Sequence, residues 1–170
     1  AEMINKRLQA LRPELKTRLL PAADGGEGSA EILARYLQAE AVKIRISDPL
    51  MRPIDAKYFY HSESRTALIE SAEASGLIRL SKKEQNPLNT SSAGTGEMIA
   101  AAAEAGARTI ITAIGGSATN DVGAGLVHAL GVRFYDANNQ RIIPTGSRLG
   151  KITSAETGFV KYDFNTIRLI

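Results

Sequence analysis

The chain has 170 residues, of which 44% are apolar and 23% charged, with a net charge of +3 and no cysteine. The missing cysteines exclude a disulfide framework and a cysteine-based metal site, and they fit a cytoplasmic protein. Scattered basic residues and few aromatic ones argue against nucleic acid as a partner, and no apolar run approaches the roughly 20 residues that a membrane helix needs.

The first quarter of the chain predicts two helices joined by a glycine-rich loop. Apolar residues recur with a helical period over 1–12 and again over 29–40, where Ser29 is the expected N-cap. Between the two helices lie a short strand candidate at 19–20 and the loop 24–29.

The next segment predicts three strands of an antiparallel meander. Apolar and polar residues alternate over 41–46, and strand-like runs follow at 54–60 and 66–70 with short connections. Residues 79–93 are polar and irregular, and they are the candidate for a crossing between two domains.

The second half of the chain indicates the α/β class. The expected elements are a helix over 96–105, a strand covered on both faces at 109–114, a helix over 122–130, strands at 131–135 and 166–170, and a polar turn at 136–140. The stretch 141–165 carries no clear pattern.

Three segments rich in glycine and hydroxyl groups precede helices, and they are the most informative feature. We call 24–29 the first loop, 89–97 the second loop and 115–121 the third loop. In such loops backbone N–H groups can approach an anion closely, and the helix N-terminus favours negative charge. Three of them together, carrying carboxylates and hydroxyls, suggest a site for a phosphorylated ligand and its metal.

The first loop offers Asp24 and Glu27 to a metal ion or a substrate hydroxyl, while Gly25, Gly26 and Gly28 leave space for the ligand. The alternative is a tight turn followed by a helix cap. Both interpretations stay open.

The second loop carries hydroxyl and N–H groups that could hold phosphate oxygens. The candidates are Thr90, Ser91, Ser92, Gly94 and Gly96. The segment lacks the Gly-Lys-Ser/Thr ending of a Walker A loop, and it is not a dinucleotide fingerprint. For this loop alone, a hydroxyl-rich helix entry is the favoured alternative.

The third loop is the strongest candidate, because it follows a buried strand and opens a helix, as ligand sites in α/β sheets do. Asn120 and Asp121 are placed to meet a cation or a substrate hydroxyl, and Gly115, Gly116 and Ser117 stand ahead of them. The alternative is an Asx cap made by Asp121.

Taken together, these loops resemble the type 1 glycerate kinase family. The matching motifs are 23–28, 69–77, 86–92 with 94–99, 115–125 and 129–134. The resemblance covers about residues 1–153, and its most specific block is 115–125.

The resemblance implies ATP, Mg²⁺ and glycerate as ligands, and two α/β domains, one flavodoxin-like and the second inserted into it. In that scheme residues 1–80, with the meander, belong to the first domain and 81–170 to the inserted one, with the site between them. The family begins with a strand and an Asp-Ser-Phe-Lys type loop and continues beyond residue 170, so we expect flanking sequence. Val122 stands where the family usually has glycine.

We therefore hypothesise a kinase that moves the γ-phosphoryl group of ATP onto a hydroxyl of D-glycerate. Asp24 or Asp121 would be the catalytic base, and Asp121 and Glu27 would bind Mg²⁺. Phosphates or substrate would bind to the second and third loops and to Gly25, Gly26 and Glu27 of the first loop. Which aspartate is the base, and whether the 2- or 3-hydroxyl reacts, stay open. One rival is an inactive truncated fragment or a non-catalytic nucleotide-binding or oligomerisation module, because unpaired sheet edges favour homo-oligomers. A second rival is a kinase for a related small hydroxy acid.

Overall fold

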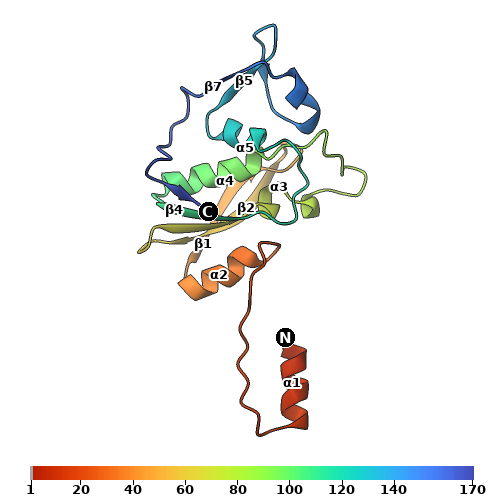
Figure 1. The fold of residues 1–170 in the computed structure, drawn as a ribbon, viewed down its shortest axis with the longest axis vertical. Coiled ribbons are helices and arrows are strands. Elements are labelled where there is room, and N and C mark those ends of the chain that lie inside the picture. Colours follow the sequence, from red (N-terminus) through yellow and green to blue (C-terminus); the bar gives the residue numbers. More distant parts are fainter. Residues whose placement is uncertain (1) are drawn as a thin grey trace.

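The computed structural model describes residues 2–170, and its centre is a five-stranded mixed sheet (Figure 1). The strand order is β1 (Glu40–Ser47), β2 (Pro53–His61), β3 (Thr66–Glu70), β4 (Thr109–Ala113) and β8 (Arg168–Leu169). The first three strands pair antiparallel, which confirms the predicted meander, whereas β4 joins β3 in parallel and β8 joins β4 in parallel. The α/β class is confirmed.

Helices cover both faces of this sheet. The covering helices are α2 (Ser29–Leu37) on one face and α3 (Ala72–Ser75) with α4 (Ala93–Glu104) on the other. The remaining helices are α1 (Glu2–Leu11), α5 (Ala124–Ala129) and the short 3-10 helices η1 (Leu77–Arg79) and η2 (Gly146–Lys151). Because side chains alternate along a strand, Phe59 and Leu68 pack on the α2 side, while Tyr58 and Ile69 pack on the α4 side. Helix α5 packs on α4.

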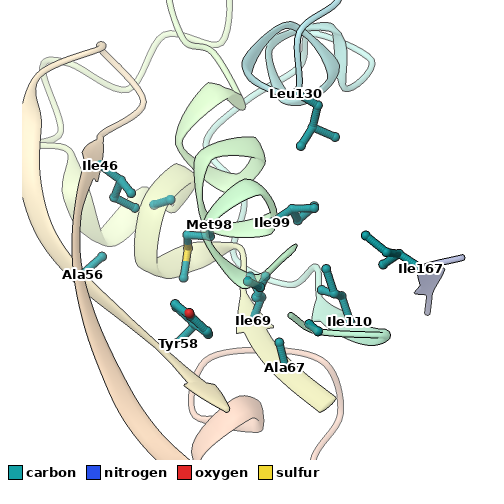
Figure 2. Packing of buried hydrophobic residues seen from close by; sticks show 13 residues of the cluster. Ile46, Ala56, Tyr58, Ala67, Ile69, Met98, Ile99, Ile110, Leu130 and Ile167 are labelled. Carbon is teal, nitrogen blue, oxygen red and sulfur yellow. The ribbon is translucent and has the colours of Figure 1, made fainter. Parts of the chain in front are cut away.

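The main core lies between α4 and the sheet. Figure 2 shows Met98 and Ile99 of α4 lying over the sheet residues Tyr58, Ile69 and Ile110, and the side chains of Met98, Ile69 and Ile110 are fully buried. Ile110 contributes to this core, and its neighbour in β4 packs on the α2 side, so β4 is covered on both faces as predicted.

A second, three-stranded sheet lies beyond α5 at the top of Figure 1. Its order is β6 (Arg141–Ile142), β5 (Arg133–Tyr135) and β7 (Ser154–Glu156). The predicted polar turn is confirmed, since Asp136 N–H donates to Gln140 O at 3.0 Å. Strands of two or three residues are too short for an alternating pattern, which explains why 141–165 gave no signal.

Three local predictions were wrong. Residues 19–20 form no strand and Leu20 is 63% exposed. Gly28 rather than Ser29 occupies the N-cap of α2, with a φ of 84°. Helix α5 begins at Ala124 rather than 122, because Val122 and Gly123 both have positive φ values, which a right-handed helix does not accept.

Strands on both sides of residue 80 share the large sheet. The predicted division into domains 1–80 and 81–170 stays a prediction. Residue 1 of the predicted helix 1–12 lies outside the described residues. Within 2–170, no helix is both long and apolar enough to cross a membrane.

Candidate functional site

The three loops meet beyond one edge of the large sheet, where β3 and β4 end. The carboxyl ends of parallel strands share one edge, which is where ligands bind in α/β sheets. The third loop follows β4 directly, and Ser71, just past β3, donates its N–H to Ala113 O at 2.9 Å.

The third loop lies between the other two and touches both. At its start, Gly115 N–H donates to Gly25 O of the first loop at 2.7 Å. A Cβ at Gly115 would lie 2.6 Å from Gly26 Cα, so only glycine allows this approach. At its end, Asp121 accepts hydrogen bonds from Ser92 of the second loop.

Asp121 is buried, and both of its carboxylate oxygens accept hydrogen bonds from protein groups. The side chain is 2% exposed. Its Oδ2 accepts from Ser92 N–H at 2.8 Å, Ser92 Oγ at 2.9 Å and Gly125 N–H at 3.0 Å, and Oδ1 accepts from Gly123 N–H at 3.2 Å. These contacts match the alternative interpretation of Asp121 as a cap that ties the loop to α5.

The carboxylates of the first loop have the opposite environment. Asp24 is exposed and its Oδ1 accepts only the Gly26 N–H, at 2.8 Å, among the hydrogen bonds of the described chain. Glu27 is also exposed, and its Oε1 lies 3.6 Å from where a Cβ on Gly116 would be. The junction of the first and third loops therefore presents two carboxylates to solvent beside the exposed residues Gly116 and Ser117.

Most phosphate-binding candidates of the second loop are enclosed by protein. Thr90 and Ser91 are 0% exposed, and Thr90 Oγ1 donates to Ala118 O at 2.9 Å. Cβ atoms at Gly94 and Gly96 would lie 1.9 Å from Ser47 O and 2.2 Å from Leu126 O. Close packing of α4 against β1 and α5 accounts for both glycines.

A pocket of about 280 Å³ opens between the third loop and the start of α4. Hydroxyl groups on its wall come from Ser71, Ser75, Thr95, Thr112, Ser117 and Thr119. Ser92, Asn120 and Asp121 also line it, together with the apolar side chains of Ile114, Val122 and Leu126. No lysine or arginine of residues 2–170 lines it, so the wall mixes hydroxyl and apolar groups and offers no cation to a bare triphosphate.

Sequence reasoning missed Glu70, the last residue of β3. It is 8% exposed, and its carboxylate accepts the Gly28 N–H with both oxygens, at 3.0 and 2.9 Å. The sequence signal for Glu70 was an acidic residue at the end of a run that is otherwise apolar or hydroxyl-bearing. The structure shows that all five residues of this strand are buried.

The described residues contain no group of three or more His, Cys, Asp or Glu side chains arranged to hold a metal ion. Asp121 does not suit a metal, because its oxygens already accept four hydrogen bonds. Asp24 and Glu27 have exposed carboxylates, which suit a cation that keeps most of its water ligands.

Comparisons with known proteins agree along the whole chain. The model of the glycerate kinase family matches residues 1–170. The Glycerate kinase of Bacillus subtilis (strain 168) is 38% identical over 169 residues, and the Glycerate 2-kinase of Escherichia coli (strain K12) is 39% identical over 156 residues, covering 99% and 92% of this chain. A crystal structure of a protein assigned as glycerate kinase 2 of Salmonella typhimurium LT2 matches 99% of this chain with a TM-score of 0.85 at 36% identity. This chain spans 44%, 41% and 45% of the lengths of those three proteins.

Proposed function

Because the chain belongs to the glycerate kinase family, we propose that the protein it represents transfers the γ-phosphoryl group of ATP to a hydroxyl of D-glycerate. The observation that supports this best is the junction of the first and third loops, where exposed carboxylates stand beside glycine backbone at the carboxyl edge of parallel strands. Phosphoryl transfer needs positioning and charge neutralisation more than covalent chemistry, and such a junction can supply both.

The two candidate bases, Asp24 and Asp121, differ in their exposure to solvent. A general base must reach the proton that it removes. Asp24 is exposed and free to meet a substrate hydroxyl, whereas Asp121 is 2% exposed and occupied by four N–H and O–H donors. We therefore assign to Asp24 the acceptance of the hydroxyl proton as the oxygen–phosphorus bond forms and ADP leaves, and to Asp121 the support of the third loop.

For Mg²⁺ the same comparison favours Glu27 over Asp121. Mg²⁺ in phosphoryl-transfer sites is usually held by one or two carboxylates together with phosphate oxygens and water. Glu27, with Asp24 beside it, has exposed oxygens for this purpose. When bound there, the ion would neutralise charge on the transferred phosphoryl group.

The binding set changes in a similar way. The exposed groups of the third loop, Gly116, Ser117 and Asn120 with the adjacent Gly115 backbone, remain candidates for phosphate or substrate oxygens. Thr90, Ser91, Gly94 and Gly96 leave this set because protein encloses them, and Ser92 leaves it because its N–H and its hydroxyl both donate to Asp121. The pocket beside the third loop keeps a wall of hydroxyl and apolar groups. That pocket is our candidate for the glycerate moiety.

Three finer statements belong to the same proposal. The name of the Escherichia coli relative favours the 2-hydroxyl as the acceptor. A cytoplasmic location would give access to ATP. We also expect the protein to self-associate to a homo-oligomer, because the eight-residue strand β1 forms an open edge of the large sheet.

The decisive experiment is ADP release from Mg·ATP and D-glycerate, with the unfolding free energy measured on the same samples. We expect Asp24→Asn to lower turnover by about 10²–10⁴-fold, as loss of a general base does, with little change in stability. Asp121→Asn should instead destabilise the fold by about 1–3 kcal/mol, because a buried carboxylate oxygen becomes an NH₂ group that faces N–H donors.

The assays run on this chain and on a form extended to the length of the relatives. Activity of the extended form alone supports the proposal and shows that this chain holds part of the site. If both forms are folded and neither releases ADP, the binding-module alternative replaces the kinase. The position of the phosphate on the product, read from ¹H–³¹P couplings, tests the choice of the 2-hydroxyl.

A further inference from the structure

We propose that Glu70 is a positioning residue that fixes the first loop in the shape that presents Asp24 and Glu27. The catalytic consequence rests on the function proposed above, whereas the coupling of Glu70 to the loop rests on the structure alone. Glu70 touches neither exposed carboxylate. It acts through the backbone of Gly28.

The contacts of Glu70 place its charge at the N-terminus of α2. Both oxygens accept the Gly28 N–H, at 3.0 and 2.9 Å, and Oε2 also lies 3.4 Å from Ala30 N. The first N–H groups of a helix have no partner within the helix, and an anion at that end is stabilised by the helix dipole. No side chain of α2 performs this capping, since Gly28 occupies the N-cap position.

The location of Glu70 makes this cap rigid. β3 is buried along its full length, and Leu68, two residues earlier, packs against Ala30 and Ala34 of α2. The strand therefore holds the carboxylate, and the carboxylate holds the N–H groups that end the first loop. Since Gly28 also has a φ of 84°, a change at this point would alter the direction in which the loop leaves the helix.

Glu70 also prevents the first loop from binding phosphate through the N–H groups at the start of α2. A glycine-rich loop before a helix is a common phosphate cradle, because its N–H groups point at the anion. Here Glu70 already occupies the N–H groups at the start of α2. The first loop therefore serves to present side chains, and phosphate oxygens must find N–H donors elsewhere, with the third loop as the nearest candidate.

The structure offers a specific test, because a pocket of about 230 Å³ adjoins this contact and is lined by Gly28, Ala30 and Glu70. Truncation in Glu70→Ala would leave the N–H groups without a partner and open space for a small carboxylate. Formate added at constant ionic strength, with chloride as the comparison, should then replace the lost side chain.

The matched control is Glu31→Ala. Glu31 lines the same pocket and belongs to the first turn of the same helix, but its carboxylate pairs with Arg35 at 2.7 Å rather than with backbone N–H groups. Each variant removes one negative charge from the lining of this pocket. Only the loss of Glu70 removes the cap.

The primary measurement is amide hydrogen exchange at Gly28 and Ala30 in this chain. We expect Glu70→Ala to speed exchange by about tenfold or more, the effect of losing hydrogen bonds to a charged acceptor, and formate but not chloride to reverse it. Glu31→Ala should leave these amides as in the parent. Unchanged exchange in Glu70→Ala, or equal acceleration in Glu31→Ala, would overturn the proposal.

Two further experiments address a variant that does not fold and the effect of Glu70 on catalysis. If Glu70→Ala does not fold, Glu70→Gln, which keeps one acceptor oxygen, is measured in the same way and should show a smaller acceleration. In an active form of the protein, kcat should fall in Glu70→Ala by about tenfold or more, with recovery in formate. Recovery of exchange protection without recovery of kcat would refute the positioning role. Absence of turnover in the folded extended form would refute the proposed function, and the exchange result would still decide the link between Glu70 and the loop.

Discussion

At the scale of single residues, burial separates side chains that look alike in the sequence. Asp24 begins a glycine-rich segment and Asp121 ends one, yet Asp24 is exposed whereas Asp121 is 2% exposed and accepts four hydrogen bonds. A buried carboxylate with satisfied oxygens rigidifies the loop around it, whereas an exposed one can exchange its partners. Chemistry that needs a mobile proton acceptor therefore points to Asp24.

Val122 is a residue under local strain, and we predict that Val122→Gly stabilises the protein. Its φ is 49°, a left-handed conformation that is unfavourable for a β-branched side chain, and it is 85% exposed, so little packing is lost on truncation. The gain should be about 1 kcal/mol, the left-handed penalty reduced by the extra chain entropy of glycine.

Urea unfolding of the two proteins measures this difference, with Val122→Ala as the control. Alanine keeps the Cβ and therefore most of the penalty, so its effect should be smaller than that of glycine. A lower unfolding free energy for Val122→Gly than for the parent would contradict the strain argument.

At the scale of elements, the sequence predicted the strands better than the contacts between loops. The period-2 pattern located β1, and strand-like runs with short connections located β2, β3 and their meander. The start of α4 was missed by three residues, since Gly94 and Gly96 looked like loop residues although they lie inside the helix. Which glycines face a ligand and which face another helix depends on contacts between distant segments, and no local pattern reports those.

The glycines at the start of α4 give a prediction about packing. Gly94→Ala would place a Cβ 1.9 Å from Ser47 O, so α4 must move away from β1. We expect a loss of about 1–3 kcal/mol or more in unfolding free energy, as for other overpacked interiors. Gly150→Ala is the matched control, since nothing lies within 4 Å of its Cβ position, and it should change stability by less than about 0.5 kcal/mol. Equal effects of the two variants would show that α4 does not need the close approach.

The segment that leads into β8 is attached to α4 by a contact that depends on pH. Tyr162 donates its hydroxyl to Glu104 Oε1 at 2.7 Å, and burial, followed by this hydrogen bond, raises the pKa of Tyr162 from 10.0 to about 12. Because the folded pKa lies above the unfolded one, the stabilisation is complete below pH 10 and is lost as pH rises through about 12.

Tyr162→Phe isolates this effect. The unfolding free energy of the parent minus that of the variant should be constant at neutral pH and shrink between pH 10 and 12, measured by urea unfolding at each pH. The ultraviolet titration of the parent should contain fewer phenols near pH 10 than its unfolded form, because burial raises the pKa of Tyr58 as well as that of Tyr162. A difference that stays constant up to pH 12 would mean that Tyr162 titrates normally.

At the scale of the whole molecule, the large sheet joins segments that the sequence seemed to divide. Strands from residue 40 to residue 169 share it, and the third loop follows β4. The candidate site therefore depends on the segment 79–93 to bring the second loop beside the third, as the contact of Ser92 with Asp121 requires. Patterning could predict the three loops, but their meeting depends on the parallel pairing of β3 with β4, which a sequence does not display.

Helix α1 stands apart from this body (Figure 1). It also exposes apolar side chains. It has no buried residue, and Met3, Ile4 and Leu11 are 85%, 66% and 60% exposed. Contiguous apolar surface of this kind usually marks a contact site. We therefore predict that the 170-residue chain self-associates through α1, because burying these side chains against a second copy removes apolar area from water.

Light scattering across a range of concentrations tests this, with Ile4→Glu and Leu11→Glu combined as the disrupting variant. A charge within the contact must be desolvated, so the combined variant should stay monomeric where the parent assembles. Lys6→Glu is the control on the same helix, since Lys6 is exposed and polar already. Equal masses for the parent and both variants would assign any assembly to the open edge of β1 instead, because that edge offers unpaired backbone groups that no α1 substitution alters. A parent that is monomeric throughout would refute self-association by either route.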